Sequence, residues 1–224
     1  RAWRPAPDVF NFTIAIDACA KGAGWQQALA LARALQEAAL RPDTASRCAT
    51  MEACGRARQW RAVLALLCEL QLLRVAAGIV GHSIAITACE KATRWRAAVG
   101  LLADARAARL AADQICCSST ISACEKAHNW QLALLLLGSM RRQGLQLCVV
   151  SCSAAMSACE KGHRWRKALA LLAGMGARRI AANAVSYGAA ISACEKECQW
   201  LLAIGLLAEM PRVRVDPNTV SYSA

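Results

Sequence analysis

The chain has 224 residues, of which 57% are hydrophobic and 19% charged, and its formal net charge is +12. No apolar run reaches the ~18 residues of a membrane-spanning helix, because the longest, Ala62 to Cys68, ends at Glu69. A chain of this length usually forms one or two globular domains, but an internal repeat overrides that expectation.

The repeat has a period of 35 residues, which is kept by one tryptophan in each unit: Trp25, Trp60, Trp95, Trp130, Trp165 and Trp200. A cysteine keeps the same step: Cys19, Cys54, Cys89, Cys124, Cys159 and Cys194. Self-similarity at this period is typical of solenoids. We divide the chain into a single array of six full units, 9–43, 44–78, 79–113, 114–148, 149–183 and 184–218, with partial units at 1–8 and 219–224. The pattern is that of a section of a longer array.

Each unit, in chain order, predicts a first helix, a turn and a second helix. In the unit 79–113, Val80 and Lys91 project within about 20° of one another on the first helix, whereas Cys89 projects to the opposite, core side. The second helix begins near Trp95, and its apolar residues follow the spacing of a buried helical stripe. We expect the tryptophan to be a core wedge between units.

The thirteen cysteines are interpreted as reduced, small apolar residues. Equivalent atoms of stacked units lie about 8–10 Å apart, which is too far for a disulfide. The sequence has neither a C-x-x-C pair nor an H-x₃-H pair, so no zinc site or other metal is expected.

A cation stands two residues after each periodic cysteine, and we name these six side chains the cation row: Lys21, Arg56, Lys91, Lys126, Lys161 and Lys196. A periodic row of cations in a basic chain indicates a polyanionic ligand. The alternative is a solvated helix face, which is favoured by the glutamate that precedes four of the six cations.

Several features together resemble the P-type pentatricopeptide repeat family. They are the period, the two helices per unit, the Pro-Asp of Pro42-Asp43, the Val-Ser-Tyr of Val185-Ser186-Tyr187 and the A-L-x-L-L-x-x-M run from Ala168 to Met175. Four residues depart from the tyrosine that the family usually has: Arg47, His82, Cys117 and Cys152. The resemblance implies an all-α fold, a right-handed α-solenoid of helix-turn-helix repeats. Tetratricopeptide repeats, with a period of 34 and mostly protein ligands, fit less well.

The resemblance further implies single-stranded RNA binding, with one base per unit and the chain parallel to the RNA. In the family, the fifth and last residues of a unit read the base edge, which here selects Thr13, Asp43, Ser83, Asp113, Ser118, Ser153, Asn183, Gly188 and Asn218. The second residue packs against bases, which selects Phe10, Val80, Ile115, Val150 and Val185. The cation row would bind phosphates, with a slope of log K against log salt of about −4.

The paired residues then predict a base for each unit. Thr13 with Asp43, and Ser83 with Asp113, favour guanine, because a carboxylate accepts from guanine N–H groups. Ser153 with Asn183, and Gly188 with Asn218, favour adenine. The remaining two units, Cys48 with Gly78 and Ser118 with Cys148, predict no preference. The expected core site is 5′-G-N-G-N-A-A-3′.

The sequence lacks a phosphate loop, an H-E-x-x-H motif and a nucleophile elbow. We therefore expect neither an enzyme nor a cofactor, a small-molecule substrate or a membrane partner. No targeting peptide is visible; the family resemblance implies a chloroplast or mitochondrial location and a role in RNA processing, stability or translation. The alternative function is a tetratricopeptide-like scaffold that binds acidic peptides.

Overall fold

The computed structural model describes residues 8–22, 24–38, 43–72, 78–110 and 113–216. Within these ranges the secondary structure consists of twelve α-helices and one short 3₁₀ helix, with no strand, so the all-α prediction is confirmed. The first helices of the repeats are α1 (Val9–Lys21), α3 (Thr44–Arg56), α5 (Gly78–Lys91), α7 (Gln114–Lys126), α9 (Val149–Lys161) and α11 (Ala184–Glu195). The second helices are α2 (Trp25–Glu37), α4 (Trp60–Leu72), α6 (Trp95–Ala107), α8 (Trp130–Arg142), α10 (Trp165–Ala177) and α12 (Trp200–Glu209), followed by η1 (Met210–Val213).

The residue before most first helices acts as its N-cap, and its side chain accepts a hydrogen bond from a backbone N–H of the first turn. These N-caps are Asp8, Asp43, Asp113, Cys148 and Asn183. Such a side chain satisfies one of the donors that every helix leaves unpaired at its start. Four of the five are the last residues of repeats, so the last residue of one repeat begins the first helix of the next.

The turn inside five of the repeats passes through one residue with left-handed backbone geometry. Thr93 has a φ of 59°, and Arg94 N–H donates to the Cys89 carbonyl across 2.8 Å. This closing bond is that of a Schellman motif, which ends a helix without glycine at some steric cost. Arg58, His128, His163 and Cys198 hold the equivalent place. The second helix then begins at the periodic tryptophan, as predicted.

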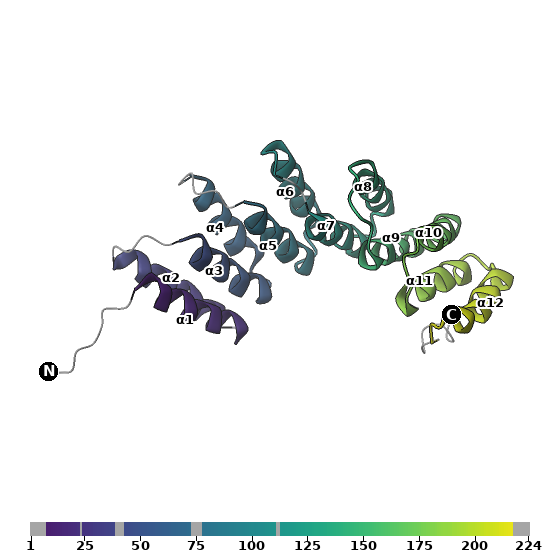
Figure 1. Cartoon of the computed structure of the whole chain (residues 1–224), viewed down its shortest axis with the longest axis horizontal. Helices are drawn as coiled ribbons and strands as arrows, with labels where there is room; N and C mark the ends of the chain where they lie inside the picture. Colours follow the sequence, from purple (N-terminus) through teal and green to yellow (C-terminus); the bar gives the residue numbers. More distant parts are fainter. Residues whose placement is uncertain (1–7, 23, 39–42, 73–77, 111–112, 217–224) are drawn as a thin grey trace. The chain divides into compact units, whose positions relative to one another are not determined.

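The structure consists of two compact units, 1–112 and 113–224, each with three repeats. In the first, α3 packs between α1 and α5, and in the second, α9 packs between α7 and α11 (Figure 1). Each second helix contacts its own first helix and, inside a unit, the first helix of the following repeat. The solenoid is therefore built by pairing each repeat with its neighbours along the sequence.

The core of the first unit lies where two first helices and one second helix meet. Met51 and Cys54 of α3, Val63 of α4 and Ala85 of α5 are all fully buried in one cluster. In the second unit, Cys159, Ala168 and Ala193 form the equivalent contact among α9, α10 and α11. The small residues let the helices approach closely. Apolar residues of α2, α4, α6, α8 and α10 are buried, as predicted, whereas α12 has no buried residue.

The positions that depart from the family's tyrosine are nevertheless interior positions. His82, Cys117 and Cys152 are buried, as is Tyr187, which keeps the tyrosine. The Tyr187 hydroxyl lies 3.3 Å from the Glu209 carboxylate, and Arg47 makes the equivalent contact with Glu69 at 3.4 Å. Arginine can therefore take the place of tyrosine at this position because the carboxylate that it meets is also present.

The tryptophans are half-buried rather than fully enclosed, so the expectation of a core wedge is wrong in detail. Trp60 and Trp165 pack against the cores with part of the ring. Arginines cover much of the rest: the guanidinium of Arg94 lies 5.2 Å from the Trp60 ring centroid, and that of Arg164 lies 4.9 Å from Trp130. Each arginine comes from the following repeat, so cation–π contacts join neighbouring repeats. Trp200 of α12 is exposed.

All thirteen cysteines are free thiols, and five of the six periodic ones are fully buried. Burial raises the pKa of Cys89, Cys124 and Cys159 to about 11. These thiols behave as small apolar side chains, as predicted. Among the helices that the structure describes, none is long and apolar enough to cross a membrane.

Candidate nucleic-acid interface

The second residue of the repeat presents an apolar side chain to solvent. We name these residues the apolar row; their side chains are 56–70% exposed, and they are Phe10, Val80, Ile115, Val150 and Val185. Each lies in the first turn of a first helix, two residues after the end of the preceding repeat. Exposed apolar side chains at equivalent positions within each unit form a repeated surface feature, which is typical of an interaction site.

The last residues of the repeats lie beside the apolar row because they cap the same helices. One carboxylate oxygen of Asp43 accepts from Ser46 N–H at 2.8 Å, and one of Asp113 accepts from Cys116 N–H at 2.8 Å. In each case the cap uses one of the two carboxylate oxygens. Asn183 Oδ1 accepts from both the backbone N–H and the hydroxyl of Ser186. Because only the amide oxygen can accept these bonds, the NH₂ group of the exposed Asn183 takes no part in the cap.

The fifth residues stand one helical turn after the apolar row, and the hydroxyl protons of three of them, Thr13, Ser118 and Ser153, are already engaged. The hydroxyl of Thr13 donates to the Val9 carbonyl at 2.8 Å, and that of Ser153 donates to the Val149 carbonyl at 2.6 Å. Such i−4 bonds leave the oxygen lone pairs as acceptors. Thr13 is half-buried, and Ser118 and Ser153 are buried, so these oxygens have little access to solvent.

The fifth and last residues of the fourth repeat are in contact. The Ser118 hydroxyl lies 3.6 Å from the Cys148 sulfur, and it also donates to the Gln114 carbonyl at 2.6 Å. The structure thus brings together one of the pairs predicted from the sequence, although that pair carries no predicted preference.

The remaining predicted readers differ in placement. Ser83 is half-buried and lines a cavity of about 230 Å³ together with Arg56 and Lys91 of the cation row. Gly188 is buried in α11. Asn218 lies outside the described residues.

The surroundings of Cys148 favour the thiolate. Burial alone would raise its pKa, but hydrogen bonds with Ser151, Gln114 and Ser118 outweigh burial and lower the pKa from 9.0 to about 7. The sulfur also caps α9, since Ser151 N–H donates to it at 3.4 Å. The Cys148 sulfur thus takes the capping place that Asp43, Asp113 and Asn183 hold in other repeats.

The cation row lies at the C-terminal ends of the first helices, and several of its members are already paired. Lys21 contacts Asp17 at 2.7 Å, and Arg56 donates to the Ala20 carbonyl at 3.2 Å. Lys161 and Lys196 each contact a glutamate of the preceding repeat. Lys126 also has a partner. Among the described residues, Lys91 is exposed and has no partner. The charge of the row is therefore partly neutralised within the protein.

Sequence reasoning missed the two glutamates of these pairs, Glu125 and Glu160. Each was interpreted only as the residue before a lysine. The signal is nevertheless present, because a period of 35 places the glutamate of one repeat 36 residues before the lysine of the next, and adjacent first helices bring these two positions together.

Comparison with known proteins agrees with the repeat and the fold. Residues 115–145 and 185–215 match a family model described as PPR repeat, and residues 135–197 match one described as pentatricopeptide repeat domain. None of the curated proteins matches the chain.

Several solved structures share the fold. The pentatricopeptide repeat protein PPR10 from maize is 20% identical with a TM-score of 0.69, over 97% of this chain and 31% of that chain. PPR10 in complex with an 18-nt psaJ RNA element is 22% identical with a TM-score of 0.65, over 98% and 36%. The PPR domain of Arabidopsis thaliana protein-only RNase P 1 in complex with tRNA is 11% identical with a TM-score of 0.69, over 77% and 91%.

The chain therefore spans about a third of the length of PPR10. At these identities, likeness to the solved structures concerns the fold alone. Taken together with the 35-residue units of two helices and the repeat-model matches, it leads to one conclusion: the chain is a pentatricopeptide repeat protein.

Proposed function

We propose that this chain binds single-stranded RNA along the N-terminal ends of its first helices, at about one nucleotide per repeat. The proposal rests on one observation: an exposed apolar side chain lies beside a capping side chain, and the cap leaves one polar atom of that side chain unused. Ile115 with Asp113, and Val185 with Asn183, show the arrangement in the second unit. The RNA complexes of PPR10 and of the PPR domain of protein-only RNase P 1 add support by fold.

The apolar row supplies the sequence-independent part of base binding. Bases have apolar faces, and packing each face against an exposed side chain removes both surfaces from water, with stacking worth about 1–3 kcal/mol per base where the side chain is aromatic. Phe10 is the one aromatic member, and Val80, Ile115, Val150 and Val185 offer smaller areas. We expect affinity to arise from several modest contacts rather than from one anchor.

The capping bonds supply the discrimination between purines. In guanine, N1 carries a hydrogen and can donate, whereas in adenine N1 is an acceptor. The outward carboxylate oxygen of Asp43 or Asp113 accepts from guanine and repels the adenine lone pair. The outward NH₂ of Asn183 donates to adenine N1 and opposes the guanine N–H. The proposed site in RNA is accordingly 5′-G-N-G-N-A-A-3′, in which the last position depends on Asn218.

The biological setting that we propose is organellar RNA processing, stability or translation, and this rests on the family resemblance. In this setting the chain positions itself on an RNA and supplies no reacting group of its own.

The apolar row gives a direct test. Replacing Ile115, Val150 and Val185 with serine removes three exposed apolar surfaces and should leave the fold intact, because these side chains are 57–61% exposed. We expect RNA affinity to fall by about 100-fold, which corresponds to roughly 1 kcal/mol per site. Leu135 of α8 is 60% exposed and lies off this face, so Leu135→Ser is the matched control. Equal losses in both variants would contradict the proposal.

A further inference from the structure

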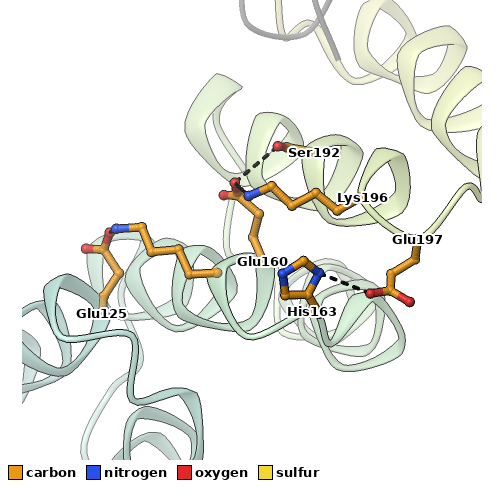
Figure 2. Close-up of polar contacts among 7 residues, drawn as sticks. Glu125, Glu160, His163, Ser192, Lys196 and Glu197 are labelled. Atoms are coloured by element: carbon orange, nitrogen blue, oxygen red, sulfur yellow. Dashed lines mark hydrogen bonds and ion pairs between the residues drawn. The ribbon is translucent and has the colours of Figure 1, made fainter.

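Two glutamates of the second unit hold lysines of the cation row across neighbouring repeats. Glu125 Oε1 of α7 lies 2.6 Å from Lys161 Nζ of α9, and Glu160 Oε1 of α9 lies 2.7 Å from Lys196 Nζ of α11. Glu160 also accepts a hydrogen bond from the Ser192 hydroxyl at 3.1 Å. Figure 2 shows Glu160 between Ser192 and Lys196, at the junction of two repeats. We name the two pairs the Glu–Lys ladder.

The Glu–Lys ladder is partly shielded from water. The glutamate side chains are each 20% exposed, and the lysines are 30% and 34% exposed. Short charge-assisted contacts are stronger than neutral hydrogen bonds, and burial reduces their screening by water and salt. An RNA phosphate that approaches either lysine therefore meets an amine that already has an anionic partner.

The first unit lacks this partner at the equivalent positions. Thirty-six residues before Lys91 stands Gly55, and thirty-six before Arg56 stands Ala20, whose backbone carbonyl accepts from the guanidinium at 3.2 Å. Gly55 and Lys91 line the same cavity of about 230 Å³. The same chain thus contains a row position with a glutamate partner and one without it.

We propose that Glu125 and Glu160 compete with the RNA phosphates for the lysines. The cation row therefore binds phosphate weakly in the second unit, whereas Lys91 of the first unit is available. This inference rests on the proposed RNA-binding function and names further positioning residues for it. Phosphate contacts carry no sequence information, so weakening them lowers the affinity for any polyanion. Binding at the fourth to sixth repeats then depends on the base contacts.

The competition has a measurable signature in the salt dependence of RNA binding. Each lysine that neutralises a phosphate of a single strand contributes a slope of about −0.7 in log K against log salt. A lysine that remains with its glutamate contributes little. Breaking one Glu–Lys pair by Glu125→Gln or Glu160→Gln should therefore steepen the slope by about 0.7 and raise RNA affinity about three- to tenfold.

The control must distinguish the loss of one Glu–Lys pair from the change in net charge. Glu195 has the same register on α11, is exposed and contacts no lysine of the row among the described residues, so Glu195→Gln makes the same charge change without releasing a lysine. The reverse change is Gly55→Glu, which should give Lys91 a partner. A Cβ at residue 55 would meet the Ala88 Cβ at 3.5 Å, an ordinary contact, and the cavity offers space for the carboxylate.

The experiment measures affinity for a labelled single-stranded oligonucleotide at several salt concentrations, for the wild type and each variant, with circular dichroism as the check on folding. Steeper slopes and tighter binding for Glu125→Gln and Glu160→Gln than for Glu195→Gln, with the opposite change for Gly55→Glu, support the inference. Equal effects of the three glutamine variants overturn the inference, and so does weaker RNA binding by Glu125→Gln or Glu160→Gln. In both cases the RNA-binding function stands. A wild-type chain that binds no RNA overturns both.

Discussion

The Cys148 sulfur lies 3.6 Å from the Ser118 hydroxyl, so the last residue of the fourth repeat meets the fifth residue of the same repeat. These two positions are 30 residues apart in sequence and come from the start of α9 and from α7. The contact joins the two proposed readers of one base, although Ser118 itself is buried.

Cys148→Asp should give the fourth repeat a guanine preference. Aspartate caps α7 at the equivalent position, where Asp113 accepts from Cys116 N–H, so the cap survives the change. The outward carboxylate oxygen then accepts from guanine N1–H. We expect about tenfold tighter binding of oligonucleotides with guanine at the fourth site position than with adenine. Affinities for the four bases at that position check the prediction, and Cys148→Ser, which also caps, should show no such preference.

The stability of the fold should depend on pH through Cys148. Because the pKa of this thiol is about 7 in the folded chain against 9.0 ordinarily, the native state binds fewer protons between these values. Its contribution is fully present above pH 9 and is lost as pH falls through 7. The stability advantage of the wild type over Cys148→Ser should therefore grow from pH 7 to pH 9. Denaturant titrations at pH 6, 7, 8 and 9 measure it, and parallel profiles of the two proteins would refute it.

Asn183→Asp should turn the fifth repeat from adenine to guanine. The aspartate can still accept from Ser186 N–H, as Asn183 does at 3.0 Å, so the helix start is kept while the outward NH₂ becomes an oxygen. Asp43→Asn should change the first repeat in the opposite direction. Each substitution changes the preference by about 1–3 kcal/mol if the contact is direct. Competition between oligonucleotides that differ at one base tests both, and an unchanged preference would contradict the reading by capping residues.

Gly162→Ala should weaken the junction of the fourth and fifth repeats. A Cβ at residue 162 would overlap the Trp130 indole, which is held between this turn and Arg164. We expect a loss of about 1–3 kcal/mol in the free energy of unfolding. Gly100→Ala is the control, because a Cβ in the middle of α6 meets nothing and should stabilise the helix by about 0.5–1 kcal/mol. Thermal or denaturant unfolding distinguishes the two, and equal effects would argue against the tryptophan contact.

The sequence predicted the period, the two helices and the exposed face because these depend on regular spacing. A buried stripe needs only helical periodicity, and this placed Cys89 inside and Val80 and Lys91 outside, as the structure has them. The tryptophan was predicted less well. Its burial depends on Arg94 and Arg164, whose contacts come from the following repeat and from the geometry of the turn.

The chemistry of the candidate site depends on contacts between particular atoms. Residue type alone cannot say which atom of Asn183 faces outward, since that is fixed by the two hydrogen bonds from Ser186. The lowered pKa of Cys148 likewise depends on hydrogen bonds with residues of two helices. The Glu–Lys ladder can be predicted from the sequence, because its residues are separated by the period plus one residue. The prediction requires each lysine to be compared with the glutamate of the preceding repeat.

The central claim is that this helical array binds RNA through bases and not acidic proteins through charge. The most direct measurement titrates the wild-type chain, at physiological salt, with a labelled single-stranded RNA that contains 5′-GNGNAA-3′, with a scrambled RNA of the same composition and with an acidic peptide. The account predicts the tightest binding for the designed site, weaker binding for the scrambled RNA and no competition by the peptide. Binding of the peptide that RNA does not displace would contradict it.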